Sequence, residues 1–324
     1  MTTTQKRYRA FGRVLESAVP LGELHEVAAG DESVGWRLLL ADGSPPACPH
    51  AIPIGQEDIA YGATVSLALL GEGAYRLTYS DTGVFDLSAP EGVIRWWRPA
   101  GCDMDLAAMD ILGRVVATIL HAEGTVTLHA SAVAVDGVAI GFLAPKFHGK
   151  STLAAAMTYV GAQLVSDDAL AILPGTSIRC FPGVPSMRLR EEAAAHFPRT
   201  RGLEVPEDIG RWRVIDMLPS DQVALQPLPL DALYVLSPRL PGEVTLPVQR
   251  TALSSLDGLL ALTRFAKMGT LLGDREGQRH ISRVIDVVAS VPVYTLELVR
   301  DLDQLAEVTR TIAAWHRRPQ ESAT

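Results

Sequence analysis

Apolar and polar positions alternate in short runs over the first hundred residues of the chain. Residues 75–79 and 84–87 carry apolar side chains at every second position, in a region rich in glycine and proline. This period is typical of strands that bury one face. We therefore predict a small β-rich domain over residues 1–100.

The pattern changes to a helical period between residues 105 and 121. Apolar side chains recur there at intervals that place them on one face of an amphipathic helix: Leu106, Met109, Leu112, Val115, Val116, Ile119 and Leu120. We expect this helix to lead into a second domain over residues 101–324.

Two apolar runs follow, at 127–135 and 138–144, separated by Asp136-Gly137, a pair typical of a hairpin turn. Nearly continuous apolar runs are expected of strands buried on both faces. The alanine-rich residues 151–159 predict a helix that ends before Gly161, and residues 162–165 predict another strand.

Farther along, residues 182–213 mix arginines with prolines and glycines, which predicts a short helix and long loops. Core strands are predicted at 232–236 and 293–298, and helices at 276–289 and 301–316. The expected fold class is α/β, with a smaller β-rich domain before a larger domain.

A loop containing glycine and lysine separates the strand 138–144 from the helix 151–159. Residues 144–151, APKFHGKS, fit the phosphate-loop pattern G-x-x-x-x-G-K-[ST], with Ala144 in place of the first glycine. Such loops surround a polyphosphate with backbone N–H groups, while their lysine reaches the β- and γ-phosphates and their hydroxyl holds Mg²⁺. An ordinary strand-to-helix turn is the alternative. We expect ATP and Mg²⁺ to bind here, on Ala144, Pro145, Lys146, Phe147, His148, Gly149, Lys150, Ser151 and Thr152.

Two adjacent carboxylates, Asp167 and Asp168, follow the predicted strand 162–165. The end of such a strand should lie beside the phosphate loop. In phosphoryl transfer one carboxylate can accept the proton of the attacking hydroxyl while the other helps to hold Mg²⁺. A surface turn is the alternative for an isolated pair, and the neighbouring loop favours the functional interpretation.

Residues 128–172, from Leu128 through the loop to the paired aspartates, resemble the catalytic core of HPr kinase/phosphorylase and of the broader HPr kinase-like proteins. The resemblance implies a phosphoenolpyruvate-carboxykinase-like phosphate-loop fold. It also implies that Asp167 is the general base and that Asp168, with Ser151, supports the metal or the substrate. It further implies that Lys150 binds the β- and γ-phosphates and that His129 lies near the transferred phosphoryl group. Taken alone, His129 is better explained as a satisfied histidine in the core or at a strand edge, and only the surrounding motif makes the functional interpretation equally good.

The chain also departs from this family. Ala144 replaces a glycine, and the glycine-rich signature that follows the arginine in true HPr kinases is not evident. These departures argue against a bifunctional sugar-regulatory HPr kinase. Some HPr kinase-like proteins with an N-terminal β domain resemble tailoring kinases that act on a serine of a natural-product precursor peptide.

Composition excludes several classes of function. The 324 residues carry a formal net charge of -8, which argues against general binding to nucleic acid or to an anionic membrane. The three cysteines show neither zinc-site nor disulfide spacing, and they fit a reducing cytoplasm. Residues 1–24 lack the apolar core of a signal peptide, and no apolar run approaches the roughly 18 residues that span a bilayer.

We therefore expect a cytoplasmic, Mg-ATP-dependent kinase whose acceptor is a hydroxyl, foremost a serine of a peptide or protein. A kinase of a small-molecule alcohol and a nucleotide-binding regulatory protein without catalysis are the alternatives. The sequence leaves open the identity of the acceptor, the choice of ATP or GTP, a reverse phosphorylase activity, homo-oligomer formation and the role of the N-terminal domain.

Overall fold

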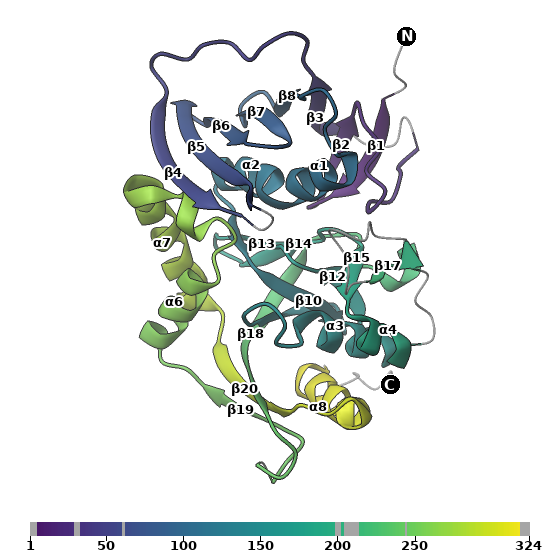
Figure 1. Cartoon of the computed structure of the whole chain (residues 1–324). Coiled ribbons are helices and arrows are strands. Elements are labelled where there is room, and N and C mark those ends of the chain that lie inside the picture. The colour runs from purple at the N-terminus through teal and green to yellow at the C-terminus, as the bar shows by residue number, and fades with distance from the viewer. Residues whose placement is uncertain are drawn as a thin grey trace, which may run out of the picture.

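Two large β-sheets with helices packed against them form a mixed α/β protein (Figure 1). The computed structural model describes residues 5–28, 33–59, 62–197, 202–203, 214–243 and 245–317. The first sheet and its helices lie at one end of the molecule in this view, and the second sheet lies below them.

The first sheet contains eight strands in the order β1-β2-β3-β8-β7-β6-β5-β4. Its alternating sequence buries one face, as Tyr75, Leu77 and Tyr79 show in β6. The strands predicted at 75–79 and 84–87 are confirmed. The eight strands are β1 (Lys6–Ala10), β2 (Arg13–Ser17), β3 (Val34–Leu40), β4 (Ile52–Asp58), β5 (Thr64–Gly71), β6 (Ala74–Tyr79), β7 (Gly83–Ser88) and β8 (Val93–Trp97).

The predicted helix of residues 105–121 is also present, and it packs against the first sheet. It consists of α1 (Met104–Asp110), a π-helical turn η2 (Ile111–Val115) and α2 (Val116–Ala122). Val115 and Leu120 share one hydrophobic core with Leu77 and Trp96 of the sheet. The helix therefore adds to the packing of the sheet that precedes it, and the division of the chain at residue 100 stays a prediction.

The second sheet has nine strands and contains the predicted hairpin. Asp136 and Gly137 form its turn, with φ of 47° and 80°, between the antiparallel strands β10 and β11. β11 then pairs in parallel with β18, and β18 with β20. The nine strands are β9 (Val126–Leu128), β10 (Ala130–Val135), β11 (Val138–Leu143), β12 (Gln163–Ser166), β13 (Leu170–Leu173), β14 (Arg179–Phe181), β18 (Leu228–Arg239), β19 (Val248–Ala252) and β20 (Val293–Val299).

Helices cover both faces of this sheet, which explains why β10 and β11 are buried along their whole length. α3 (Lys150–Tyr159) and α8 (Leu305–His316) contribute to the hydrophobic core on one face. α6 (Ser255–Arg264) and α7 (Gly273–Ser290) contribute to the core on the other. The strands and helices predicted after residue 125 are confirmed in these positions.

A three-stranded sheet, in the order β15-β17-β16, was not predicted. Its strands are β15 (Ser186–Leu189), β16 (Gly202–Leu203) and β17 (Val214–Met217), with α4 (Glu191–His196) after β15. The helix agrees with the prediction for 182–213, whereas β15 replaces a predicted loop. Arg199, Arg201, Arg211 and Arg213 of that segment lie outside the described residues.

Three 3-10 turns complete the described backbone: η3 (Ser220–Gln222), η4 (Gly269–Leu271) and η5 (Leu302–Gln304). Among the helices of the described residues, none has the length and the apolar character needed to cross a membrane.

Candidate active site

The loop of residues 144–149 connects the carboxyl end of β11 to the first residue of α3. Gly149 caps the helix with a φ of 89°, a left-handed conformation that glycine adopts without steric cost. Its carbonyl accepts the first helical hydrogen bond, from the Leu153 N–H at 2.8 Å. The N-terminus of α3, with its unpaired N–H groups, therefore lies at this loop.

Lys150 is folded back over the same loop. The side chain is buried, and its Nζ donates hydrogen bonds to the Ala144 carbonyl at 2.8 Å and to the Pro145 carbonyl at 3.3 Å. The His129 Nε2 lies 3.3 Å from the same ammonium. The predicted lysine and histidine are thus brought together, although they are separated by β10, β11 and the loop.

A cavity of about 320 Å³ opens beside the loop. Most of the residues predicted to bind nucleotide border it, whereas Ala144 and Pro145 contribute carbonyl groups to Lys150. The cavity is lined by His129, Lys146, Phe147, His148, Gly149, Lys150, Ser151, Thr152, Leu153, Asp167, Asp168, Arg188, Arg190, Glu192, Ala193, Pro238, Leu298, Val299, Arg300, Asp301, Leu302 and Leu305.

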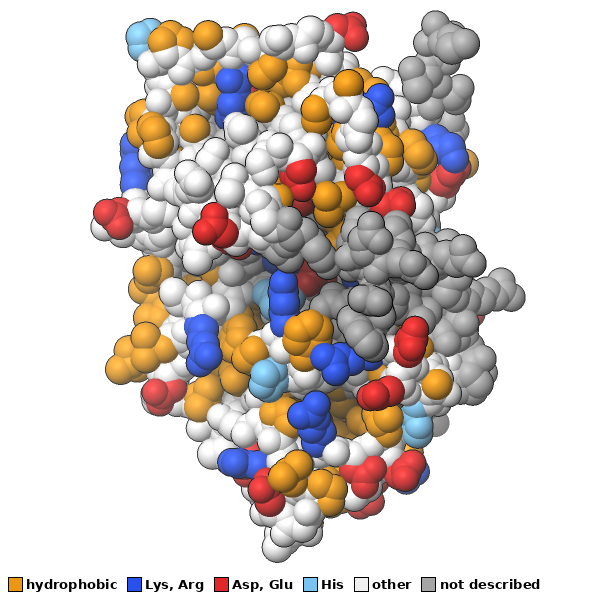
Figure 2. All heavy atoms as spheres, in the orientation of Figure 1, with side chains coloured by type: hydrophobic (Ala, Val, Ile, Leu, Met, Phe, Trp, Pro, Cys, Tyr) orange, Lys and Arg blue, Asp and Glu red, His pale blue; other side chains and the backbone are white. Residues whose placement is uncertain are grey.

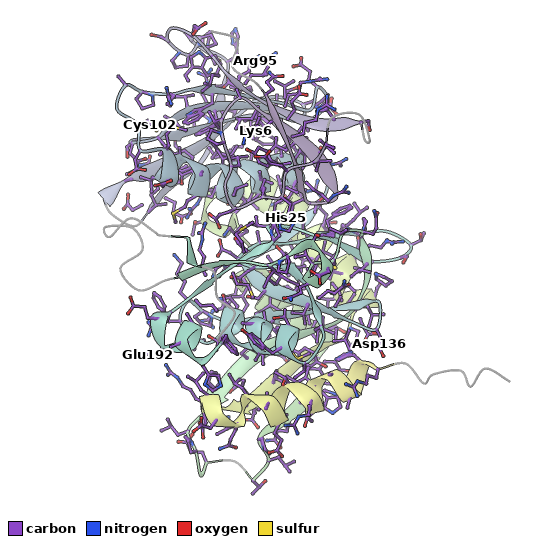
Figure 3. The ribbon with its side chains drawn as sticks, turned by 90° about the vertical axis from the view of Figure 1, so that its right-hand side faces the viewer. Lys6, His25, Arg95, Cys102, Asp136 and Glu192 are labelled. Carbon is purple, nitrogen blue, oxygen red and sulfur yellow. The ribbon has the colours of Figure 1, made fainter. Side chains whose placement is uncertain are left out.

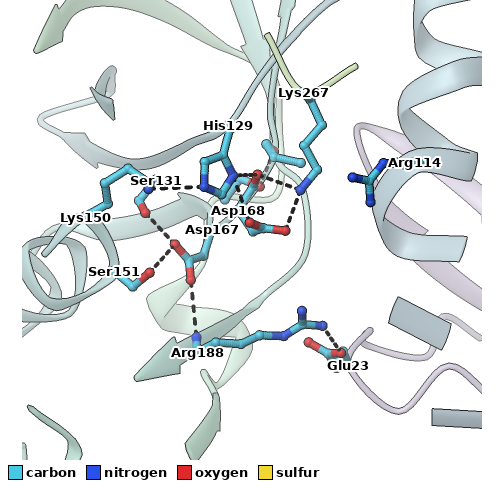
Figure 4. Close-up of polar contacts among 12 residues, drawn as sticks. Glu23, Arg114, His129, Ser131, Lys150, Ser151, Asp167, Asp168, Arg188 and Lys267 are labelled. Atoms are coloured by element: carbon cyan, nitrogen blue, oxygen red, sulfur yellow. Dashed lines mark hydrogen bonds and ion pairs between the residues drawn. The ribbon is translucent and has the colours of Figure 1, made fainter. Parts of the chain in front are cut away.

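Asp167 is held at the end of β12 by hydrogen bonds from three elements (Figure 4). Its Oδ1 accepts from the Ser151 hydroxyl at 2.9 Å and also from the Ser131 hydroxyl. Its Oδ2 accepts from the Arg188 backbone N–H at 3.2 Å. The side chain of Asp167 is buried, and its hydrogen bond from Ser151 directs the carboxylate at the first hydroxyl of α3.

Asp168 differs from its neighbour in both conformation and partners. Its φ of 66° turns it away from the strand, and 42% of its side chain remains exposed. Its carboxylate pairs with the Lys267 Nζ at 2.5 Å and with the His129 Nδ1 at 3.0 Å. Burial raises the pKa of Asp168, but Lys267 and His129 together outweigh burial and hold the pKa well below its usual value.

The partners of His129 indicate its tautomer. A lysine ammonium can only donate, so the Nε2 that faces Lys150 must be the acceptor. The proton then resides on Nδ1, which donates to the carboxylate of Asp168. His129 therefore links Lys150 of the loop to Asp168.

The rim of the cavity is formed by Phe147 and His148. Phe147 has a φ of 70° and is 58% exposed, and the Arg190 guanidinium lies 4.6 Å from the centre of its ring. The exposed His148 donates from Nδ1 to the Lys146 carbonyl at 3.0 Å. Figure 2 shows Lys, Arg and His side chains gathered near the middle of the face seen in Figure 1.

The donor atoms at the loop suit Mg²⁺, which prefers hydroxyl and carboxylate oxygens. Within the described part of the chain, no group of three or more His, Cys, Asp or Glu side chains is arranged to hold a metal ion. Mg²⁺ commonly binds through one or two protein oxygens together with the phosphates of a substrate. Ser151 and Asp167, which share a hydrogen bond, match the protein's part of such a site.

Three contributors to this site were missed in the sequence. Ser131 lies in an apolar run that reads as core, and Lys267 lies 99 residues from Asp168 with no motif around it. The Arg188 N–H reaches Asp167 because β15, which was not predicted, passes beside β12. Arg188 itself was visible in the sequence as one of the arginines of residues 182–213.

No family model matches the sequence, and no curated protein matches it. Among solved structures, the chain is similar to the Hpr(Ser) kinase/phosphatase from Coxiella burnetii, with 16% sequence identity and a TM-score of 0.32. The alignment covers 59% of this chain and 95% of that chain. At this level of similarity, the assignment of a function depends on the geometry of the site.

Proposed function

We propose that this protein is an ATP-dependent kinase that transfers the γ-phosphoryl group of Mg-ATP to a hydroxyl, with a phosphate loop of the HPr kinase-like type at residues 144–151. One observation carries the proposal. Lys150 at a helix N-terminus, the Ser151–Asp167 pair and the partly exposed carboxylate of Asp168 all border one cavity. An ordinary strand-to-helix turn would not require a lysine, a hydroxyl and two carboxylates to lie around one cavity.

The loop provides positive charge and N–H donors that can bind a triphosphate. The N-terminus of α3 presents unpaired N–H groups and the positive end of the helix dipole. Lys150 now donates to two carbonyls of its own loop, and phosphate oxygens would be stronger acceptors for the same ammonium. Among the described residues, four that are not glycine have a positive φ, and two of them, Phe147 and Asp168, border this cavity. Strained conformations of this kind concentrate at binding sites.

The contacts support roles for the two carboxylates that are the reverse of those expected from sequence: Asp167 for the metal and Asp168 for the acceptor. Asp167 is bonded to Ser151, so we assign these two residues to Mg²⁺, which when bound would neutralise charge on the β- and γ-phosphates. Asp168 is the more exposed carboxylate, so we assign it to the acceptor hydroxyl. The roles expected from sequence, with Asp167 as base, remain the alternative that mutants can separate.

In the proposed reaction the acceptor oxygen forms a bond to the γ-phosphorus while the bond from that phosphorus to the β–γ bridging oxygen breaks. ADP leaves with the electron pair, and the hydroxyl proton passes to Asp168. Lys267 and His129 hold the Asp168 carboxylate in place. We place a serine of a peptide or protein first as acceptor, including a natural-product precursor peptide, because the resemblance implies it. A small-molecule alcohol is the second choice.

Transfer of labelled phosphate tests this function. Wild-type protein with γ-labelled ATP and a cell extract should label an acceptor in a Mg²⁺-dependent reaction, and Lys150→Ala should abolish the labelling. Lys6→Ala is a matched control, because Lys6 is an exposed lysine that pairs with Glu26, and neither residue lines the cavity. A protein that binds Mg-ATP but labels nothing would instead be a nucleotide-binding regulatory protein.

A further inference from the structure

A glutamate from the first part of the chain is built into the edge of the candidate site. Glu23 follows β2 of the first sheet, yet both of its carboxylate oxygens bind residues of β15. Its Oε1 accepts from the Arg188 Nη2 at 2.6 Å, and its Oε2 accepts from the Ser186 hydroxyl at 2.8 Å. Glu23 is only 9% exposed, so these contacts are shielded from solvent.

The same segment is fixed by a second contact two residues later. The His25 Nε2 donates to the Leu218 carbonyl at 2.8 Å, immediately after β17, the neighbour of β15. In Figure 3, His25 lies between the two halves of the molecule. The segment around Glu23 therefore binds the small sheet at two of its strands.

Arg188 connects this contact to the paired aspartates. Its backbone N–H binds the Asp167 carboxylate, while its guanidinium binds Glu23 (Figure 4). Arg188 also borders both the main cavity and a smaller pocket that reaches Asp167 and Asp168 from the side of Glu23. Burial lowers the pKa of Arg188, but Glu23 and the two aspartates outweigh it and raise the pKa, so the guanidinium stays charged.

We propose that Glu23 is a positioning residue of the kinase site: it holds the Arg188 guanidinium away from Asp167 and Asp168 and so leaves these carboxylates available to Mg²⁺ and to the acceptor. The inference rests on the proposed function. It also gives the N-terminal part of the chain a role in the site, because Glu23 supplies the carboxylate that binds the Arg188 guanidinium.

The consequence of losing Glu23 follows from charge. A buried guanidinium without its partner must find another anion, and Asp167 and Asp168 already attract Arg188. An Arg188 paired with either aspartate would compete with Mg²⁺ for the same oxygens. Loss of Glu23 should therefore raise the Mg²⁺ concentration needed for nucleotide binding. This effect can be measured without knowing the acceptor.

The experiment measures the Mg²⁺ concentration that gives half-maximal binding of ATP, by titration calorimetry at a fixed nucleotide concentration. Glu23→Gln keeps the size of the side chain and removes its charge, and it should raise this concentration about tenfold. The double variant Glu23→Gln/Arg188→Gln should restore it to within about threefold of wild type, because the competing cation is gone. Glu23→Asp, which keeps the charge, should stay near the wild-type value.

Glu26→Gln is the matched control, since Glu26 lies in the same segment but pairs with Lys6 on the exposed surface. It should leave the Mg²⁺ requirement unchanged. Thermal unfolding of each variant shows whether it is folded, and the double variant contains no unpaired buried charge to prevent folding.

Two results would overturn the inference while leaving the kinase proposal intact. One is an unchanged Mg²⁺ requirement in folded Glu23→Gln. The other is a double variant that is no better than Glu23→Gln, which would make Glu23 a structural tether only. If wild-type protein does not bind Mg-ATP at all, the proposed function fails first, and this inference fails with it.

Discussion

Two of the clusters of ionisable side chains among the described residues differ in what surrounds them. The cavity cluster, defined as His129, Lys150, Asp167, Asp168 and Lys267, lies beside the cavity at the glycine-containing loop. The interior cluster, defined as Tyr75, His121, Glu276, His280 and Arg283, lies where the first sheet and its helix meet α7.

Each cluster as defined contains five ionisable side chains, so their number alone does not identify the site. In the interior cluster Glu276 accepts hydrogen bonds from Tyr75 at 3.1 Å, from His121 at 3.0 Å and from Arg279 at 2.8 Å. These bonds join β6, α2 and α7, and Glu276 is buried. In the cavity cluster Asp168 remains partly exposed beside a loop that can receive phosphate. The partial exposure of Asp168 beside the loop, compared with the burial of Glu276, is therefore the difference on which the proposed function rests.

The largest effect is expected in the cavity cluster. Asp168→Asn cannot accept the acceptor's proton, and loss of a general base typically lowers the rate of transfer by about 10²- to 10⁴-fold. Single-turnover transfer should show this loss, while Mg-ATP affinity measured by calorimetry changes little. Asp167→Asn should instead raise the Mg²⁺ requirement. If Asp167→Asn abolishes transfer at every Mg²⁺ concentration and Asp168→Asn remains active, the roles expected from sequence are the correct ones.

Substitutions in the interior cluster should lower the stability of the protein and leave its Mg-ATP binding unchanged. Glu276→Gln leaves buried donors without their anion and should lower the free energy of unfolding by about 3 kcal/mol in urea denaturation. Mg-ATP affinity should not change. Glu91→Gln, which removes an exposed glutamate paired with Arg95, should change stability little and serves as the control. A weakened Mg-ATP affinity in folded Glu276→Gln would break the distinction between the clusters.

The pH dependence of stability should report on His280. Burial lowers the pKa of His280 from 6.5 to about 4, so the folded protein keeps this imidazole neutral. The unfolded chain takes up a proton as the pH falls through 6.5, so stability present above pH 6.5 is lost between pH 6.5 and about 4. The difference in pKa corresponds to about 3 kcal/mol at most.

His280→Gln should therefore lose less stability than wild type between pH 6.5 and 4, by about 2 kcal/mol after relaxation of the site. Burial raises the pKa of Asp110 to about 7, and this carboxyl acts in the opposite direction over part of the same range. The comparison of the two proteins, by urea denaturation at several pH values, cancels that contribution. Parallel profiles would mean that His280 does not titrate differently on unfolding.

The smallest effect is expected at the edge of the interior cluster. Tyr75→Phe removes one hydrogen bond to Glu276, which retains His121 and Arg279 as donors. The free energy of unfolding should fall by about 1 kcal/mol, as measured by urea denaturation. A loss as large as that of Glu276→Gln would show that the phenol, and not the carboxylate, organises the cluster.

The sequence was sufficient where the signals are local. The hairpin at Asp136-Gly137, the loop and the helix after Gly149 depend on turn residues and apolar runs within a few positions of one another. The adjacent pair Asp167-Asp168 could be recognised for the same reason. Its placement beside the loop follows from the order of β11, α3 and β12, although the chemical roles of its members remain predictions.

The sequence was insufficient where partners are distant in the chain. Lys267 reaches Asp168 across 99 residues, and Glu23 reaches Arg188 across 165, so no periodicity or motif connects them. The short strand β15 was missed because Pro182 and Pro185 precede it and favour a loop assignment. The different surroundings of the two aspartates also depend on tertiary packing, which local patterns do not encode.

Titration calorimetry of Mg-ATP is the measurement that tests the central claim most directly. Wild-type protein should bind Mg-ATP at one site, and Lys150→Ala should bind it about 100-fold more weakly, because the ammonium facing the most highly charged phosphates is lost. Lys6→Ala should bind as wild type does. Equal affinity of wild type and a folded Lys150→Ala, or no binding by either, would show that residues 144–151 form a structural turn and would contradict the proposed kinase.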